Sequence, residues 1–165
     1  MADITPEFLS FAVSKLREFE SRIVVCSGKL TEEQIWARGS ANENSFGNLV
    51  LHLSGNIRQW IVATLGGQPD ARDRDAEFAA EGGKSIAELL AHLHRAVEES
   101  VAVIESRTAE QLLAVYHVQV YDVTGVEAVF HVVEHFAMHT GQMIFLTKML
   151  TGTDLAFYAA LKKQQ

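Results

Sequence analysis

Four long segments of this chain repeat apolar residues every three or four positions, as amphipathic helices do. They cover approximately residues 6–26, 45–65, 85–104 and 124–150. Ser45, Ser85 and Thr124 stand where helix-capping side chains are preferred. Thr5 reads as the N-cap of the first helix, because Pro6 suits the first helical position. Without a convincing sheet, this pattern predicts an all-α fold, a four-helix bundle with long crossover loops.

Shorter signals fill the connections between these segments. Thr31–Gln34 and Thr108–Gln111 each read as a capping box that opens a short helical turn. Residues 68–83 form a charged loop, and residues 115–123, rich in valine and tyrosine, favour extended backbone. Each half therefore has a long helix, a short capped turn, a linker and a capped helix with histidine. This weak internal repeat predicts related places for the second and fourth helices.

Composition fits a single domain over residues 1–165, since 48% of the residues are hydrophobic and one core suffices at this length. The single cysteine, Cys26, excludes an internal disulfide, fits a reducing compartment and is expected to fill the core. The first twenty residues lack the pattern of a signal peptide, and no apolar stretch is long enough to cross a bilayer. We therefore expect a cytoplasmic protein with no membrane association.

Charge excludes one class of partner. The net charge is −7, and lysine and arginine form neither a cluster nor a stripe. A protein that binds nucleic acid must neutralise phosphates, whereas this surface repels them. No nucleic-acid partner is expected.

Of the seven histidines, three are unremarkable. His92 and His94 stand two residues apart on the third helix and therefore point to different faces. His117 lies in an irregular segment. Solvated or hydrogen-bonded side chains are the expectation for all three.

His131, His135 and His139 follow one another at four-residue spacing in an apolar helix. A four-residue step advances a helix by about 40° and about 6 Å, so adjacent imidazoles can converge on one ion. Imidazoles in a buried helix are costly unless each ring finds a partner. A stripe along a solvent-exposed helix edge is the alternative interpretation.

His52, alone among apolar residues of the second helix, can supply a further ligand across the helix interface. The residues themselves thus favour a three-histidine metal site. Their spacing does not choose between the pairs His131/His135 and His135/His139. The repeat slightly favours His131, because it follows its helix cap by seven residues, as His52 does.

The order of these parts resembles the DinB superfamily of metal-binding four-helix bundles, which includes the YfiT-like proteins and bacterial low-molecular-weight-thiol transferases. The resemblance lies in Asn48–His52 through Trp60 and in Glu134–Gln142. Those segments carry a lone histidine and then H-x-x-x-H followed closely by G-Q. The likeness covers nearly the whole chain and is nearest to an uncharacterised branch of the superfamily.

By that resemblance, the metal ligands are His52, His135 and His139. Many relatives have a second histidine where Met138 stands and an arginine at Thr140. The roles of those two positions in substrate handling therefore do not carry over to this chain.

Other polar residues are expected beside the ligands. His131 becomes a neighbour of the ligands or a cavity residue. Gln142 is placed one turn beyond His139, where it can orient a ligand or, as the slightly favoured alternative, cap a backbone group. Asn48 and Asn56 flank His52 at four-residue spacing and can hydrogen-bond its free ring nitrogen or a bound water. Ordinary helix-surface amides are an equal alternative.

A three-histidine site suits one divalent transition metal, with Zn or Ni expected as found and Fe, Co or Cu as other choices. Neutral ligands leave the ion's charge in place and at least one position open, which suits activation of water or of a thiolate. Di-iron chemistry needs Glu-x-x-His pairs on two helices, and the sequence lacks them.

The resemblance implies a metal-dependent enzyme, a thiol S-transferase or a hydrolase, acting on a small thiol or electrophile. The alternative is a non-catalytic metal-binding or stress-response bundle, and a homodimer is expected for either. No general base is evident, because Glu134 is turned about 100° away from His135 around the helix. The loop with Arg72 and Arg74 can cover the site or bind an anion, but a solvated charged loop is the favoured interpretation.

Overall fold

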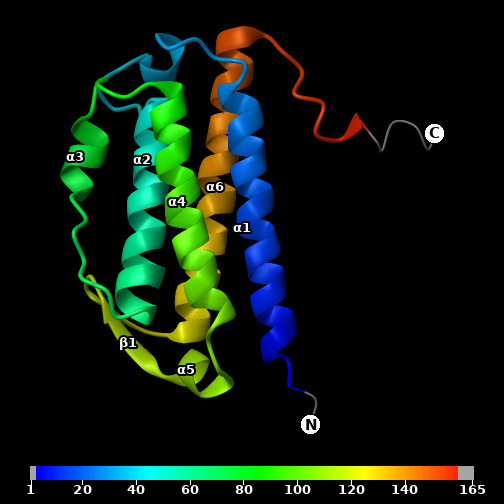
Figure 1. Ribbon diagram of the computed structural model, residues 1–165. Coiled ribbons are helices and arrows are strands. Elements are labelled where there is room, and N and C mark those ends of the chain that lie inside the picture. Colours follow the sequence, from blue (N-terminus) through cyan, green and yellow to red (C-terminus); the bar gives the residue numbers. More distant parts are fainter. Residues whose placement is uncertain (1–2, 160–165) are drawn as a thin grey trace.

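The computed structural model describes residues 3–159, which form four long helices around one core (Figure 1). The long helices are α1 (Thr5–Ser27), α2 (Phe46–Ile57), α4 (Ile86–Glu105) and α6 (Gly125–Thr151). A π-helical segment, η2 (Arg58–Leu65), continues directly from α2. The predicted all-α four-helix bundle is confirmed, with bounds close to those expected.

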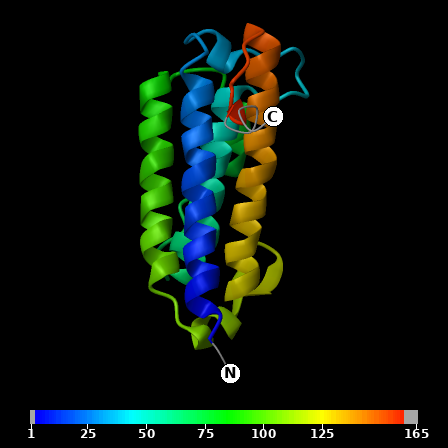
Figure 2. The same cartoon turned by 90° about the vertical axis from the view of Figure 1, so that its right-hand side faces the viewer.

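The four long helices pack as a closed ring. α1 packs against α4 and α6, and α2 packs against the same two helices from the other side. Figure 2 shows α1 in front, between α4 and α6, with α2 behind. This arrangement sets α2 beside α6, so that the helices that carry His52 and the H-x-x-x-H segment share an interface.

Large apolar side chains fill the space between the helices. Fully buried members come from all four long helices: Leu16, Ile23, Phe46, Leu53, Ile57, Leu89, Leu93, Ile104, Phe136 and Met143. Cys26 is also buried, and burial raises the pKa of its thiol. It therefore fills the core, as predicted, and does not serve as a reactive thiol.

Capping side chains open three of the long helices. Ser45, Ser85 and Thr124 each accept a hydrogen bond from the backbone N–H three residues on. The prediction of Thr5 as N-cap is wrong, because Thr5 is already helical. Its backbone N–H instead donates to Asp3 Oδ1 at 2.9 Å, so the aspartate satisfies this exposed donor.

Short elements connect the long ones: η1 (Gln34–Trp36), α3 (Arg74–Ala79), α5 (Ala109–Leu113) and a hairpin of β1 (Val115–Val118) with β2 (Tyr121–Thr124). The strands pair antiparallel from Val115↔Thr124 to Val118↔Tyr121, which confirms the expected extended backbone. The prediction of an irregular loop over 68–83 is wrong in part, because α3 forms within it, capped by Asp73.

Residues 67–85, here called the strap, return along the outside of α2 to the start of α4 (Figure 1). Within residues 3–159, no helix combines the length and the hydropathy that a bilayer crossing requires.

Candidate metal centre

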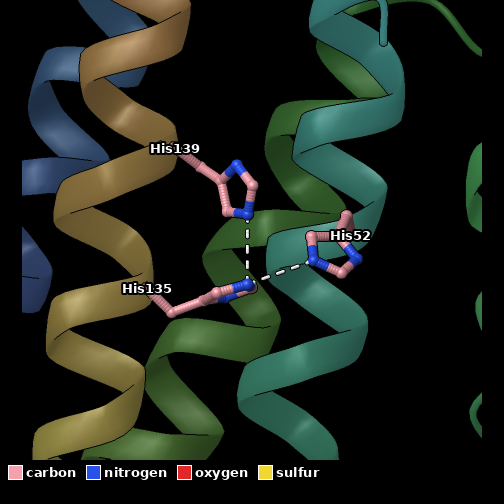
Figure 3. A group of neighbouring side chains, drawn as sticks. All are labelled: His52, His135 and His139. Carbon is pink, nitrogen blue, oxygen red and sulfur yellow. Dashed lines mark hydrogen bonds between the residues drawn. The ribbon is translucent and has the colours of Figure 1, made fainter. Parts of the chain in front are cut away.

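Three imidazoles meet where α2 and α6 face each other (Figure 3). His52 comes from α2, and His135 and His139 come from successive turns of α6. The Nε2 atom of His135 lies 3.1 Å from that of His52 and 3.1 Å from that of His139. His52 and His139 are buried, and His135 is half-buried. The structure thus brings the three rings together, with His139 rather than His131 as the partner of His135.

The spacing of these nitrogens fits a single transition-metal ion. With Zn–N bonds of about 2.0–2.1 Å, a nitrogen separation of 3.1 Å corresponds to an angle of about 100° at the ion. That angle lies between the octahedral and tetrahedral values. The donor set is therefore correct for a metal in both atom type and separation.

A carboxylate fixes the tautomer of His52. Glu77 Oε2 lies 3.0 Å from His52 Nδ1, and both side chains are buried. Burial alone would raise the pKa of Glu77, but hydrogen bonds from Arg72 and His52 hold that pKa below its ordinary value. Because an ionised carboxylate can only accept, His52 Nδ1 carries the proton. The lone pair of His52 is therefore on Nε2, the atom that faces the other rings.

Gln142 fixes His139 in the same way. The Nδ1 atom of His139 lies 2.6 Å from Gln142 Oε1, an acceptor, so Nδ1 is the protonated nitrogen. Of the two interpretations of Gln142, the geometry favours orientation of a ligand ring. By contrast, His135 Nδ1 is buried and has no hydrogen-bond partner within residues 3–159.

With these tautomers, the three nitrogens that face one another lack one hydrogen-bond donor or cation. The Nε2 atoms of His52 and His139 both present lone pairs towards His135 Nε2. A proton on His135 Nε2 can be donated to only one of these two nitrogens, so the other acceptor nitrogen lacks a donor in a buried place. A cation at the point common to the three nitrogens satisfies all of them. The residues present therefore fit a metal ion.

Burial keeps the His135 and His139 rings neutral at neutral pH. Burial, together with the neighbouring rings of His139 and His52, lowers the pKa of His135 to about 3. Burial also lowers the pKa of His139, although its hydrogen bond to Gln142 opposes the shift. Neutral imidazole is the form that binds metals, so no proton has to leave His135 or His139 at neutral pH.

The strap supplies the carboxylate and also its counter-ion. Arg72 Nε and Nη2 donate to the two oxygens of Glu77, each at 2.8 Å, in a fork-to-fork pair. Arg72 Nη2 also lies 3.1 Å from His52 Nδ1, but with Nδ1 protonated both atoms are donors, and each donates to the Glu77 carboxylate. The Arg72 side chain is only 4% exposed, so the favoured interpretation of a solvated charged loop is wrong for Arg72, whereas Arg74 is exposed as expected. A buried arginine needs a buried anion, which Glu77 supplies within the strap. The pair is tied to the bundle through His52 on α2 and Gln59 on η2.

Three residues expected beside the ligands have other contacts. His131 stacks on Trp60, with ring centroids 3.8 Å apart, and lies 5.4 Å from the His135 ring. Asn56 Nδ2 is 3.5 Å from His131 Nε2. Asn48 donates instead to the carbonyls of Glu77 and Ala80 on the strap. Neither amide hydrogen-bonds His52, because Glu77 occupies that nitrogen, and both amides are buried rather than on the helix surface. Their expected contact with a bound water stays a prediction.

The remaining histidines lie away from the centre with ordinary partners or surroundings. His94 Nδ1 pairs with Glu20 at 2.9 Å, and His117 Nδ1 pairs with Asp122 at 2.8 Å, both on the surface. Burial lowers the pKa of His92, which lies beside the strap. The expectation of solvated or hydrogen-bonded side chains is confirmed for His94 and His117.

A cavity of about 500 Å³ opens onto His52 and His135. Its walls come from η2, the strap, β2 and α6 and include Trp60, Arg74, Tyr121, Phe130, His131 and Glu134. Aromatic rings therefore surround the mouth of the candidate metal site, with cationic and anionic side chains among them. A small molecule in this cavity has access to the two ligand rings.

The sequence places these features within a known family. The family described as a protein of unknown function (DUF1572) matches residues 3–163. The chain belongs to the DUF1572 family. No protein with a curated description matches the sequence of this chain.

Solved structures resemble the DUF1572 fold closely. A conserved protein from Enterococcus faecalis has a TM-score of 0.75 and 17% identity, over 87% of this chain and 97% of that chain. The DinB-like protein YjoA from Bacillus subtilis has a TM-score of 0.67 and 20% identity, over 89% of this chain and 96% of that chain. At such identities the likeness concerns the fold. It confirms the expected four-helix-bundle fold, which is shared with a protein described as DinB-like.

Proposed function

We propose that this DUF1572 protein holds one divalent transition metal through His52, His135 and His139 and uses it as a thiol S-transferase or a hydrolase. The observation that carries the proposal is the convergence of three Nε2 atoms, with His135 Nε2 3.1 Å from each of the other two, beside a cavity that His52 and His135 line. Zn²⁺ or Ni²⁺ is the expected ion, and Fe²⁺, Co²⁺ and Cu²⁺ suit the same donors.

The cavity favours an enzyme over a purely structural site. A structural zinc site is closed by four protein ligands, whereas only three histidines converge here among the described residues. When bound, an ion with three neutral ligands keeps its charge and lowers the pKa of a water or thiol in an open position. The cavity gives a small thiol or electrophile room beside His52 and His135.

Side chains that line the cavity can supply a proton acceptor and a cation for an anionic substrate group. Glu134 lines the cavity next to His135 and is exposed, so its carboxylate can accept the proton that a thiol or water loses. Glu127 also lines the cavity, but its Oε2 already accepts hydrogen bonds from Thr124. Arg74 stands over the Phe78 ring at 4.9 Å and presents a cation to an anionic substrate group.

Turnover with defined metal tests the proposal. Metal-free protein loaded with Zn²⁺ is screened against thiol–electrophile pairs and esters, beside His52→Ala, Glu134→Gln and the control His117→Ala. We expect His52→Ala to abolish turnover with its helical circular dichroism retained, Glu134→Gln to lower kcat by about 100-fold, and the control to stay near wild type.

A different result would favour the non-catalytic alternative. If no pair turns over and His52→Ala mainly lowers the melting temperature, the ion serves stability or sensing instead of catalysis.

We also propose that two chains pair through the exposed apolar face of α6, which carries Phe130, Met138, Phe145 and Met149. Sedimentation velocity measures that assembly.

A further inference from the structure

Polar anchors, rather than a packed core, hold the strap to the bundle. Between the strap and α2 lies a cavity of about 400 Å³, where small residues such as Ala71 and Ala76 alternate with charged ones such as Asp73 and Lys84. Asn48 and Arg38 both donate to the Ala80 carbonyl at the end of α3. With a hollow beneath it, the strap depends on each of these anchors for its position.

The deepest anchor is Glu77, whose carboxylate passes over α2 to His52. The absence of a side chain at Gly55 permits this path, because a Cβ there would lie 1.9 Å from Glu77 Oε1. Arg72, also on the strap, grips both carboxylate oxygens from the other side. One strap contact thus ends on a ring of the candidate metal centre.

We propose that Glu77 is a positioning residue that holds His52 for metal binding, so that metal binding and docking of the strap strengthen each other. This inference rests on the proposed metal site. The carboxylate holds the Nδ1–H tautomer and the orientation of the His52 ring, which a metal ligand needs. Because Glu77 belongs to the strap, the energy of that hydrogen bond depends on whether the strap is docked.

Linkage makes the effect reciprocal. If a docked strap raises the metal affinity by some factor, bound metal must favour the docked strap by the same factor. An ion on Nε2 polarises the His52 ring and strengthens the hydrogen bond from Nδ1 to Glu77. The strap therefore responds to metal, although within residues 3–159 only histidines of α2 and α6 form the ligand cluster.

The metal side of the coupling is tested by Zn²⁺ affinity, measured by chelator competition. Glu77→Gln is compared with Glu81→Gln, an exposed carboxylate on the same strap. We expect Glu77→Gln to bind Zn²⁺ about 10- to 100-fold more weakly, and Glu81→Gln to bind within about 2-fold of wild type. In the metal-free protein, ¹⁵N NMR should report loss of the single Nδ1–H tautomer of His52 in Glu77→Gln, a change that loss of strap packing elsewhere does not produce.

The strap side is tested by hydrogen exchange of the α3 amides with and without Zn²⁺. We expect Zn²⁺ to slow their exchange in the wild type and to leave it unchanged in Glu77→Gln. If the wild type binds Zn²⁺ but Glu77→Gln binds it equally well, the inference is wrong while the metal site stands. If the wild type binds no Zn²⁺, the proposed function itself fails.

Discussion

Among single residues, two of the three imidazoles are oriented by a hydrogen-bond acceptor on the ring nitrogen that faces away from the centre. His52 and His139 each direct a lone pair inward because Glu77 and Gln142 accept the proton on the opposite ring nitrogen. His135 completes the set without a partner for its own Nδ1 in the described structure. The inward direction of these lone pairs, more than the short distance between the rings, favours a cation at this place.

The lowered pKa of His135 predicts how stability depends on pH. An unfolded histidine titrates near pH 6.5, whereas burial and the adjacent rings place the pKa of folded His135 at about 3. Between these values the unfolded chain binds more protons, so stability is full above pH 6.5 and is lost as the pH falls towards 3. We expect the free energy of urea unfolding of the metal-free protein to decrease between pH 7 and pH 5.

The variant His135→Gln provides the comparison for this pH effect. It should show a shallower decrease over the same pH range, which lies above the ordinary pKa values of carboxyl groups. The lowered pKa values of His131 and His139 act in the same direction, so some slope should remain. An unchanged slope in His135→Gln would mean that this ring does not carry the proton uptake.

The sequence, with its family resemblance, predicted the three rings that converge and offered Gln142 beside His139, but it did not predict Glu77. Four-residue spacing on one helix is local information, and it already indicated that adjacent rings can share an ion. Glu77 gave no signal, because it lies 25 residues from His52 and reaches it only after the strap folds back. Arg72 and Glu77 are only five residues apart, but their burial depends on where the strap meets α2, which helical periodicity does not specify.

At the scale of elements, capping residues and apolar repeats made the long helices predictable. Ser45, Ser85 and Thr124 act within three residues of their own positions, and each helix began where its cap indicated. The strap was less predictable, because its composition is polar but the side chains of Arg72 and Glu77 are buried. Arg72 reads as a solvated charge in the sequence and is nearly inaccessible in the structure.

The approach of the strap to α2 predicts the effect of Gly55→Ala. The added Cβ meets Glu77 Oε1 and must displace the carboxylate from His52, without any change of charge. We expect weaker Zn²⁺ binding than in wild type and faster hydrogen exchange in α3. Gly141→Ala is the matched control, because a Cβ there meets nothing within 4 Å. Equal Zn²⁺ affinity in the two variants would contradict the steric role of Gly55.

At the scale of the whole molecule, the bundle brings together two helices that are far apart in the chain. α1 packs against α6 and α4 packs against α2, and α2 and α6 contact each other directly, so that His52 meets His135. The hairpin and the strap then build the cavity walls around that meeting point. Apolar patterning alone predicted the bundle, whereas the cavity could not be predicted without knowing where the strap and the hairpin lie.

The central claim, one metal ion held by three histidines, is tested most directly by metal analysis. The protein is purified without a nickel column, loaded with Zn²⁺, desalted and measured by inductively coupled plasma mass spectrometry. The same procedure is applied to the variant with His52, His135 and His139 all changed to alanine. We predict one ion per chain for the wild type and none for the variant. Equal metal content in the two proteins, or a wild type that retains no metal after loading, would contradict the account.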